Sequence, residues 1–178
     1  MGFIFPIVFL LLICGLIYYL TKRVTKSFGL GKFWLAYSTI LLLTFVSFFG
    51  SQILALSVTP FGRIVSNVAA FWLMAVLYGI LSFAVIHLAG VFGNVKPKVQ
   101  GISGIILTAG IILYGVLNSY SIRVIEVTVP IKGLENPMKI VHLTDIHLGN
   151  FRGKSFLTKV VEKANGLQPD LILHTGFI

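Results

Sequence analysis

The sequence predicts a mostly α-helical protein, a four-helix transmembrane bundle followed by the incomplete start of an α/β domain. Hydrophobic residues make up 57% of its 178 residues and charged residues only 11%, about half the charge of a typical soluble domain. Four long stretches contain no charged residue at all. All five acidic residues lie after Tyr120, where short strand and helix patterns replace the long apolar stretches.

The four apolar stretches are each long enough for a transmembrane helix, which needs about 20 residues to cross the hydrocarbon core. They cover residues 2–20, 33–58, 64–92 and 101–120, and they form a predicted transmembrane domain over residues 1–121. Positive charge follows the first stretch and does not precede it. The first stretch is therefore a spanning helix by pattern and not a signal peptide.

The basic residues between the stretches predict the orientation in the membrane. The first loop carries four of them, the second one and the third two: Lys22, Arg23, Lys26 and Lys32; Arg63; Lys96 and Lys98. Because cytoplasmic loops are rich in lysine and arginine, the first and third loops are expected in the cytoplasm. Both ends of a multi-pass plasma-membrane protein would then be extracytoplasmic. Three basic residues after the last stretch favour the opposite orientation: Arg123, Lys132 and Lys139.

The net charge of +9 does not indicate a nucleic-acid partner, because half of the basic residues flank apolar stretches. At such positions lysine and arginine contact lipid headgroups, so the expected partner is the lipid bilayer. Within the stretches, Gln52, Asn67 and His87 are the notable polar residues. The first 120 residues contain no carboxylate to pair with His87, so we expect a neutral histidine hydrogen-bonded between helices. This lack of carboxylates also argues against a transporter or channel.

Residues 122–178 have the pattern of an α/β domain. Residues 122–129 and 139–144 are rich in β-branched and apolar side chains and predict two strands. Residues 155–164 carry apolar side chains at helical spacing, and residues 171–173 predict a third strand. Strand, helix and strand in this order form a βαβ unit, which implies that the two strands are parallel.

Asp145 and His147 directly follow the second predicted strand, within Leu143-Thr-Asp-Ile-His-Leu-Gly149. Residues two apart in an extended chain point to the same side, so both side chains would meet beyond the carboxyl end of the strand, where α/β sheets bind ligands. One oxygen and one nitrogen ligand suit Mn, Fe or Zn better than Ca. Strand alternation turns His142 to the other side, and His174 is expected to be an ordinary strand residue.

Two segments carry a resemblance to a known family: Lys139-Ile-Val-His-Leu-Thr-Asp-Ile-His-Leu-Gly149 and, after the predicted helix, Pro169-Asp-Leu-Ile-Leu-His-Thr-Gly176. They resemble the opening of the calcineurin-like metallophosphoesterases, most of all the membrane-anchored bacterial type. The resemblance implies that residues 122–178 are the N-terminal fragment of a domain that hydrolyses phosphate esters with two divalent metal ions. It also implies that Asp145 and His147 are metal ligands.

The sequence departs from the family pattern at Phe177. In the family, an aspartate that bridges the two ions follows the glycine that corresponds to Gly176, and the later Gly-Asn-His and Gly-His-x-His motifs have no counterpart here. We therefore expect a truncated and inactive fragment, explained by a lost reading frame, an early stop or a short form. Its catalytic set is incomplete, and it would hold at most one ion, weakly. By analogy, the intact protein would act on a lipid-linked or cell-envelope phosphoester.

A second function stays open from the sequence. The chain could be a non-enzymatic four-span membrane module that binds a protein or lipid partner. The two hypotheses differ in what the nucleotides beyond the last codon encode. An aspartate and a later Gly-Asn-His would indicate an enzyme.

Overall fold

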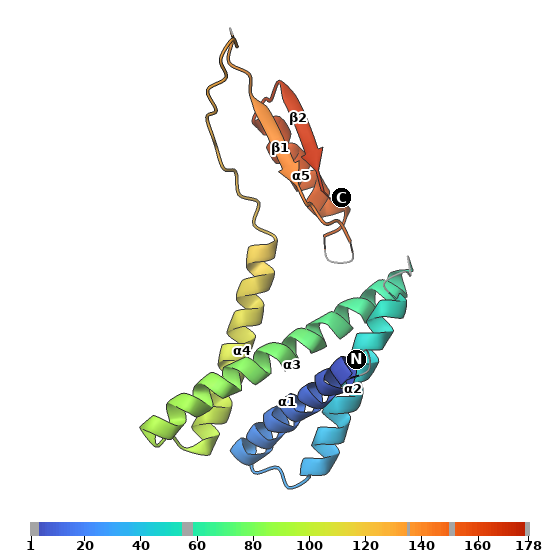
Figure 1. Cartoon of the computed structure of the whole chain (residues 1–178), viewed down its shortest axis with the longest axis vertical. Helices are drawn as coiled ribbons and strands as arrows, with labels where there is room; N and C mark the ends of the chain where they lie inside the picture. Colours follow the sequence, from blue (N-terminus) through green and yellow to red (C-terminus); the bar gives the residue numbers. More distant parts are fainter. Residues whose placement is uncertain (1–3, 55–58, 135, 150–151, 177–178) are drawn as a thin grey trace. The chain divides into compact units, whose positions relative to one another are not determined.

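A computed structural model of the chain describes residues 4–54, 59–134, 136–149 and 152–176 (Figure 1). Contacts between residues divide the chain into two compact units, residues 1–117 and residues 118–178. The domain boundary that the sequence predicts, between residues 121 and 122, stays a prediction.

Among the described residues, the first unit contains four long apolar helices, the last of which ends just beyond it: α1 (Ile4–Phe28), α2 (Phe33–Leu54), α3 (Pro60–Gly93) and α4 (Pro97–Ser119). All four are long and apolar enough to cross a membrane. Helices α1, α2 and α3 pack against one another in pairs (Figure 1). Together with the short α/β segment that follows, they confirm the predicted fold class.

The helices do not begin and end where the apolar stretches do. Helix α1 continues to Phe28, well beyond the predicted span, because a helix can extend past the hydrocarbon core into the polar interface. Helix α3 begins at Pro60, where the Thr59 side chain caps it by accepting a hydrogen bond from the Gly62 N–H at 3.1 Å. Residues 2–3 of the first predicted span and 55–58 of the second lie outside the described residues.

The core of the first unit lies where α1 and α3 pack together. Ile17, Leu20, Val76 and Phe83 are buried there, and partly buried side chains of α2 pack against them. Buried apolar side chains are few, and most large ones on these helices are exposed, which suits helices surrounded by lipid.

Hydrogen bonds connect the three helices through polar side chains. The Trp72 indole N–H donates to Thr44 Oγ1 at 3.2 Å, between α3 and α2. The Tyr19 hydroxyl donates to the Phe83 carbonyl at 3.3 Å and lies 3.4 Å from His87 Nδ1, between α1 and α3. The hydrogen bond between helices that we expected for His87 is therefore present.

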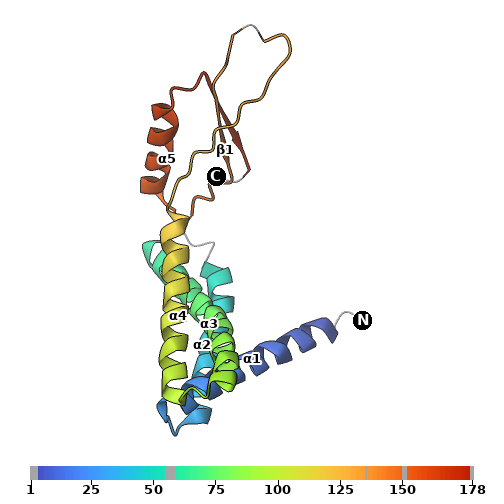
Figure 2. The ribbon, with the colours of Figure 1, turned by 90° about the vertical axis from the view of Figure 1, so that its left-hand side faces the viewer.

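The second unit contains a βαβ element made of β1 (Ile140–Thr144), α5 (Lys154–Gly166) and β2 (Leu171–Thr175). The two strands are parallel, with Ile140 opposite Leu171 and Thr144 opposite Thr175. Helix α5 buries one face at a spacing of four residues, through Phe156, Val160 and Ala164, and runs alongside the sheet (Figure 2).

The strand predicted over residues 122–129 is wrong. Residues 121–131 form neither helix nor strand, and β1 pairs with β2 in the described part of this unit. Ile125, Val127 and Val129 are 84%, 76% and 67% exposed. A β-branched pattern marks a segment that fits a sheet surface, and without a neighbouring strand to pair with the segment stays irregular.

Candidate metal-binding site

The site forms where the two parallel strands end side by side. Thr144 lies opposite Thr175, and the next residue on the first strand, Asp145, donates its backbone N–H to the Thr175 carbonyl at 3.1 Å. This bond continues the ladder one step beyond β1. As a result, Asp145 and Gly176, each the first residue after its strand, lie against each other.

Gly176 makes this close approach possible. Its φ is +84°, and a Cβ placed on it would collide with Asp145 Oδ1 and lie 2.8 Å from Asp145 Cγ and 3.1 Å from its backbone nitrogen. A side chain at this position would push the carboxylate aside and would also strain the backbone. In the sequence, Gly176 stands out only as the last residue of the segment that resembles the family.

Asp145 and His147 are brought together, although not in the way the sequence suggested. His147 Nε2 lies 3.9 Å from Asp145 Oδ1, and their side chains are 62% and 59% exposed. Both residues have a positive φ, 46° for Asp145 and 49° for His147, so they are not part of an extended strand. Their side chains meet because the loop backbone turns, at a conformational cost of about 1 kcal/mol or more for each residue.

Arg152 holds this loop in place. Its guanidinium donates to the Ile146 carbonyl at 3.4 Å and to the Ser119 carbonyl at 2.9 Å. It also lies over the Phe156 ring, 5.1 Å from the ring centroid. Because Ile146 lies between Asp145 and His147, Arg152 fixes the turn that presents both side chains. The sequence did not predict this role for Arg152, since nothing in the sequence sets it apart from other basic residues.

The other two histidines of this unit are strand residues, as expected. His142 Nε2 lies 2.8 Å from Thr175 Oγ1, which gives it a cross-strand hydrogen bond. His174 lies opposite Leu143 in the sheet register and is exposed. Phe177, where the sequence departs from the family pattern, lies outside the described residues.

Asp145 and His147 lie close to the separation that two ligands of one divalent ion would need. Two ligand atoms about 2.1 Å from one ion at a tetrahedral angle are about 3.4 Å apart, so Asp145 and His147 would have to approach by about half an ångström. Rotation of exposed side chains allows such a shift. Among residues 4–54, 59–134, 136–149 and 152–176, no group of three or more His, Cys, Asp or Glu side chains could hold an ion.

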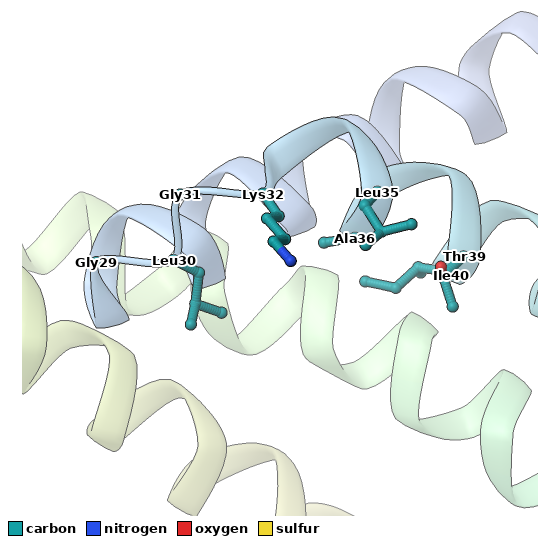
Figure 3. Close-up of a pocket in the computed structure, with 8 residues that line it drawn as sticks. All are labelled: Gly29, Leu30, Gly31, Lys32, Leu35, Ala36, Thr39 and Ile40. Carbon is teal, nitrogen blue, oxygen red and sulfur yellow. The ribbon is translucent and has the colours of Figure 1, made fainter.

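An open groove lies in the first unit, beside the connection between α1 and α2 (Figure 3). Its volume is about 520 Å³, and its lining is mainly apolar. Among the lining residues, Lys32 has the single charged side chain and Thr39 the single uncharged polar one (Figure 3). Neither Asp145 nor His147 is among the residues that line this groove.

The chain therefore combines four apolar helices with a βαβ unit that carries an Asp-x-His pair at the end of its first strand, and two curated proteins are similar to it. A Danio rerio protein named "Transmembrane protein with metallophosphoesterase domain" is 35% identical over 81 residues, which is 43% of this chain and 18% of that protein. An "Uncharacterized metallophosphoesterase" of Campylobacter jejuni is 37% identical over 60 residues, 34% of this chain and 16% of that protein. These similarities confirm the resemblance to metallophosphoesterases.

The chain matches less than a fifth of the length of each of these two relatives. No family model matches the chain, and no solved structure matches it significantly. Divalent metal ions are the general cofactors of metallophosphoesterases. Four helices long and apolar enough to span a bilayer, together with the similarity to a transmembrane protein, indicate that this chain is a membrane protein.

Proposed function

We propose that this chain is part of a membrane-anchored, metal-dependent phosphoesterase that hydrolyses phosphate esters at a two-metal site. The single observation that supports this most strongly is the pairing of Asp145 and His147 at the carboxyl end of β1, 3.9 Å apart. The edge formed by the carboxyl ends of parallel strands is the usual ligand-binding edge of an α/β sheet. The relatives named for a metallophosphoesterase domain support the same reaction class.

In this proposal Asp145 supplies a carboxylate oxygen and His147 an imidazole nitrogen to one Mn, Fe or Zn ion. When bound, such an ion polarises a phosphoryl oxygen and generates a nucleophile from water. Two contacts keep the carboxylate at the strand end. The Asp145 N–H donates a hydrogen bond to the Thr175 carbonyl, and Asp145 packs closely against Gly176. Arg152 supports the loop between Asp145 and His147 by donating a hydrogen bond to the Ile146 carbonyl.

These 178 residues alone would not complete the catalytic site. A two-ion site takes roughly six to eight protein ligands, and Asp145 and His147 supply two of them. The chain would therefore bind at most one ion, weakly, and would not turn over substrate by itself. For the intact protein, a membrane anchor favours a lipid-linked or cell-envelope phosphoester as substrate.

We place the protein in the plasma membrane, with the second unit on the extracytoplasmic side. The support for this orientation comes from the basic residues of the first unit. Six of the seven lie near the α1–α2 and α3–α4 connections, and the seventh, Arg63, lies in the first turn of α3. The positive-inside rule places the six in the cytoplasm.

Metal binding by the full chain in detergent micelles tests the assignment. We expect Mn²⁺ to bind with a Kd of about 0.1–1 mM, because two protein ligands leave most of the coordination to water. Asp145→Asn and His147→Gln should each abolish measurable binding in a calorimetric titration. Glu162→Gln and His174→Gln, exposed residues of the same types, should leave it unchanged. Equal binding by all five proteins, or no binding by the unaltered chain, would contradict the assignment.

Hydrolysis of an aryl phosphodiester in the presence of Mn²⁺ separately tests the proposed inactivity of the 178 residues. We expect no metal-dependent turnover by the 178 residues. Turnover that disappears in Asp145→Asn would show that the site is complete enough to act. That result would overturn the proposed inactivity while supporting the proposed reaction class.

A further inference from the structure

A small polar cavity lies at one end of the first unit, where three helix ends meet. Its volume is about 160 Å³, and the last turns of α1 and α3 and the first turn of α4 enclose it. Figures 1 and 2 both show these three ends together at the same end of the unit. The volume equals that of about five waters, which is comparable to a tetrahedral oxyanion with its five heavy atoms.

The lining of this cavity is positively charged and rich in hydrogen-bonding groups. Arg23, Lys26 and Ser27 come from α1, His87 from α3, and Gln100 from α4. Residues 1–120 contain no aspartate or glutamate, so no carboxylate of the first unit neutralises the two cations. A cavity with two uncompensated positive charges beside a membrane interface attracts anions from outside the unit.

The walls of the cavity are held in place by contacts between the helices. The Arg23 guanidinium lies over the Tyr19 ring, 5.5 Å from its centroid, and the hydroxyl of the same tyrosine lies 3.4 Å from His87 Nδ1. The Gln100 side chain donates to the Val95 carbonyl at 2.8 Å. Arg23, His87 and Gln100 are therefore held by contacts before a ligand binds, which lowers the entropic cost of ordering them.

Three glycines allow α4 to come close enough to form the third wall. A Cβ on Gly90 would collide with the side chain of Gln100, and a Cβ on Gly101 would lie 2.5 Å from Ser27 Cβ. One turn further along α4, a Cβ on Gly104 would lie 2.8–2.9 Å from the Phe83 ring. Small residues at helix contacts are how membrane helices approach closely, and here they lie beside the cavity.

We propose that this cavity binds a phosphate-class anion, either the phosphate of a lipid headgroup or free phosphate. Arg23 and Lys26 supply the charge, and Ser27 and Gln100 supply hydrogen bonds to phosphate oxygens. Arginine gives a planar pair of donors and lysine a point charge, the combination found at phosphate sites. The lining residues belong to the first unit and do not include Asp145 or His147, so the proposal does not depend on the proposed hydrolysis.

The test measures ligand binding to the full chain in micelles of a neutral detergent with phosphatidylcholine. The probes are dihexanoyl phosphatidic acid, inorganic phosphate and, as the zwitterionic comparison, dihexanoyl phosphatidylcholine, each titrated by calorimetry. We expect phosphatidic acid to bind at one site per chain. Binding of inorganic phosphate as well identifies a free-anion site, and binding of phosphatidic acid alone identifies a headgroup site. Both outcomes support the proposal, and binding of neither anion overturns it.

Two charge-matched double variants show whether the cavity itself is responsible. Arg23→Gln/Lys26→Gln removes the two lining cations and should weaken phosphatidic acid binding about 25-fold, at about fivefold per charge. Lys22→Gln/Lys98→Gln removes two charges that do not line the cavity and should weaken binding by less than about fivefold. Equal weakening by both pairs overturns the proposal. If the first pair unfolds, Lys26→Gln alone, at an exposed residue, should still weaken binding about fivefold.

Discussion

Replacing Gly176 with alanine perturbs the candidate metal site through its backbone. At φ +84° a non-glycine residue costs about 1–2 kcal/mol, because its Cβ approaches neighbouring backbone atoms. The added methyl group would also occupy the space of the Asp145 carboxylate. The carboxylate has to rotate away, and the backbone bond between Asp145 and Thr175 has to lengthen or break. We therefore expect a loss of local stability of at least about 1.5 kcal/mol at this strand end.

Amide hydrogen exchange of the full chain in micelles measures this loss. A cost of about 1.5 kcal/mol corresponds to exchange about 12-fold faster at the Asp145 amide, and peptides covering β1 and β2 should report it. Gly166→Ala is the matched control, because a Cβ there meets no atom within 4 Å and its φ is not positive. Gly176→Ala should also weaken Mn²⁺ binding at least tenfold. Unchanged exchange and unchanged Mn²⁺ binding in Gly176→Ala would show that Gly176 does not hold Asp145 in place.

Two further substitutions probe the loop and the helix packing. Arg152→Ala removes the hydrogen bonds to the Ile146 and Ser119 carbonyls. We expect it to weaken Mn²⁺ binding about three- to tenfold in the calorimetric titration. An unchanged Kd would show that the loop keeps its conformation without Arg152. Gly104→Leu should destabilise the first unit by about 1–3 kcal/mol through overpacking, and Gly110→Leu, which meets open space, should cost less than 0.5 kcal/mol. Thermal unfolding followed by circular dichroism compares the two leucine variants, and equal melting temperatures would contradict the packing of α4.

The sequence predicts the spanning helices well because their signal is local. A stretch of about 20 uncharged apolar residues needs no knowledge of the rest of the fold, since the bilayer alone makes it helical. The ends of the helices were harder to predict. Helix α1 runs to Phe28, and α3 begins at its Thr59 cap, because capping and the polar interface decide where a helix ends.

The segments that depend on distant partners were predicted less well. Residues 122–129 have a strand composition, but no strand in the described part of the chain pairs with them, so the prediction failed. The closeness of Asp145 and His147 was expected, whereas the positive φ values that produce it depend on the turn beyond β1. The fit of Gly176 against Asp145 follows from the register of β1 and β2, and the role of Arg152 follows from the loop. Neither can be predicted from one segment of sequence alone.

Pulsed electron paramagnetic resonance on the Mn²⁺-loaded full chain shows whether His147 binds the ion, because it detects nitrogen ligands. With histidine labelled with ¹⁵N, we expect coupling to a single imidazole nitrogen. This coupling should disappear in His147→Gln and persist in His142→Gln and His174→Gln. Mn²⁺ bound without any imidazole coupling, or with coupling that survives in His147→Gln, would contradict the assignment of Asp145 and His147 as the metal ligands.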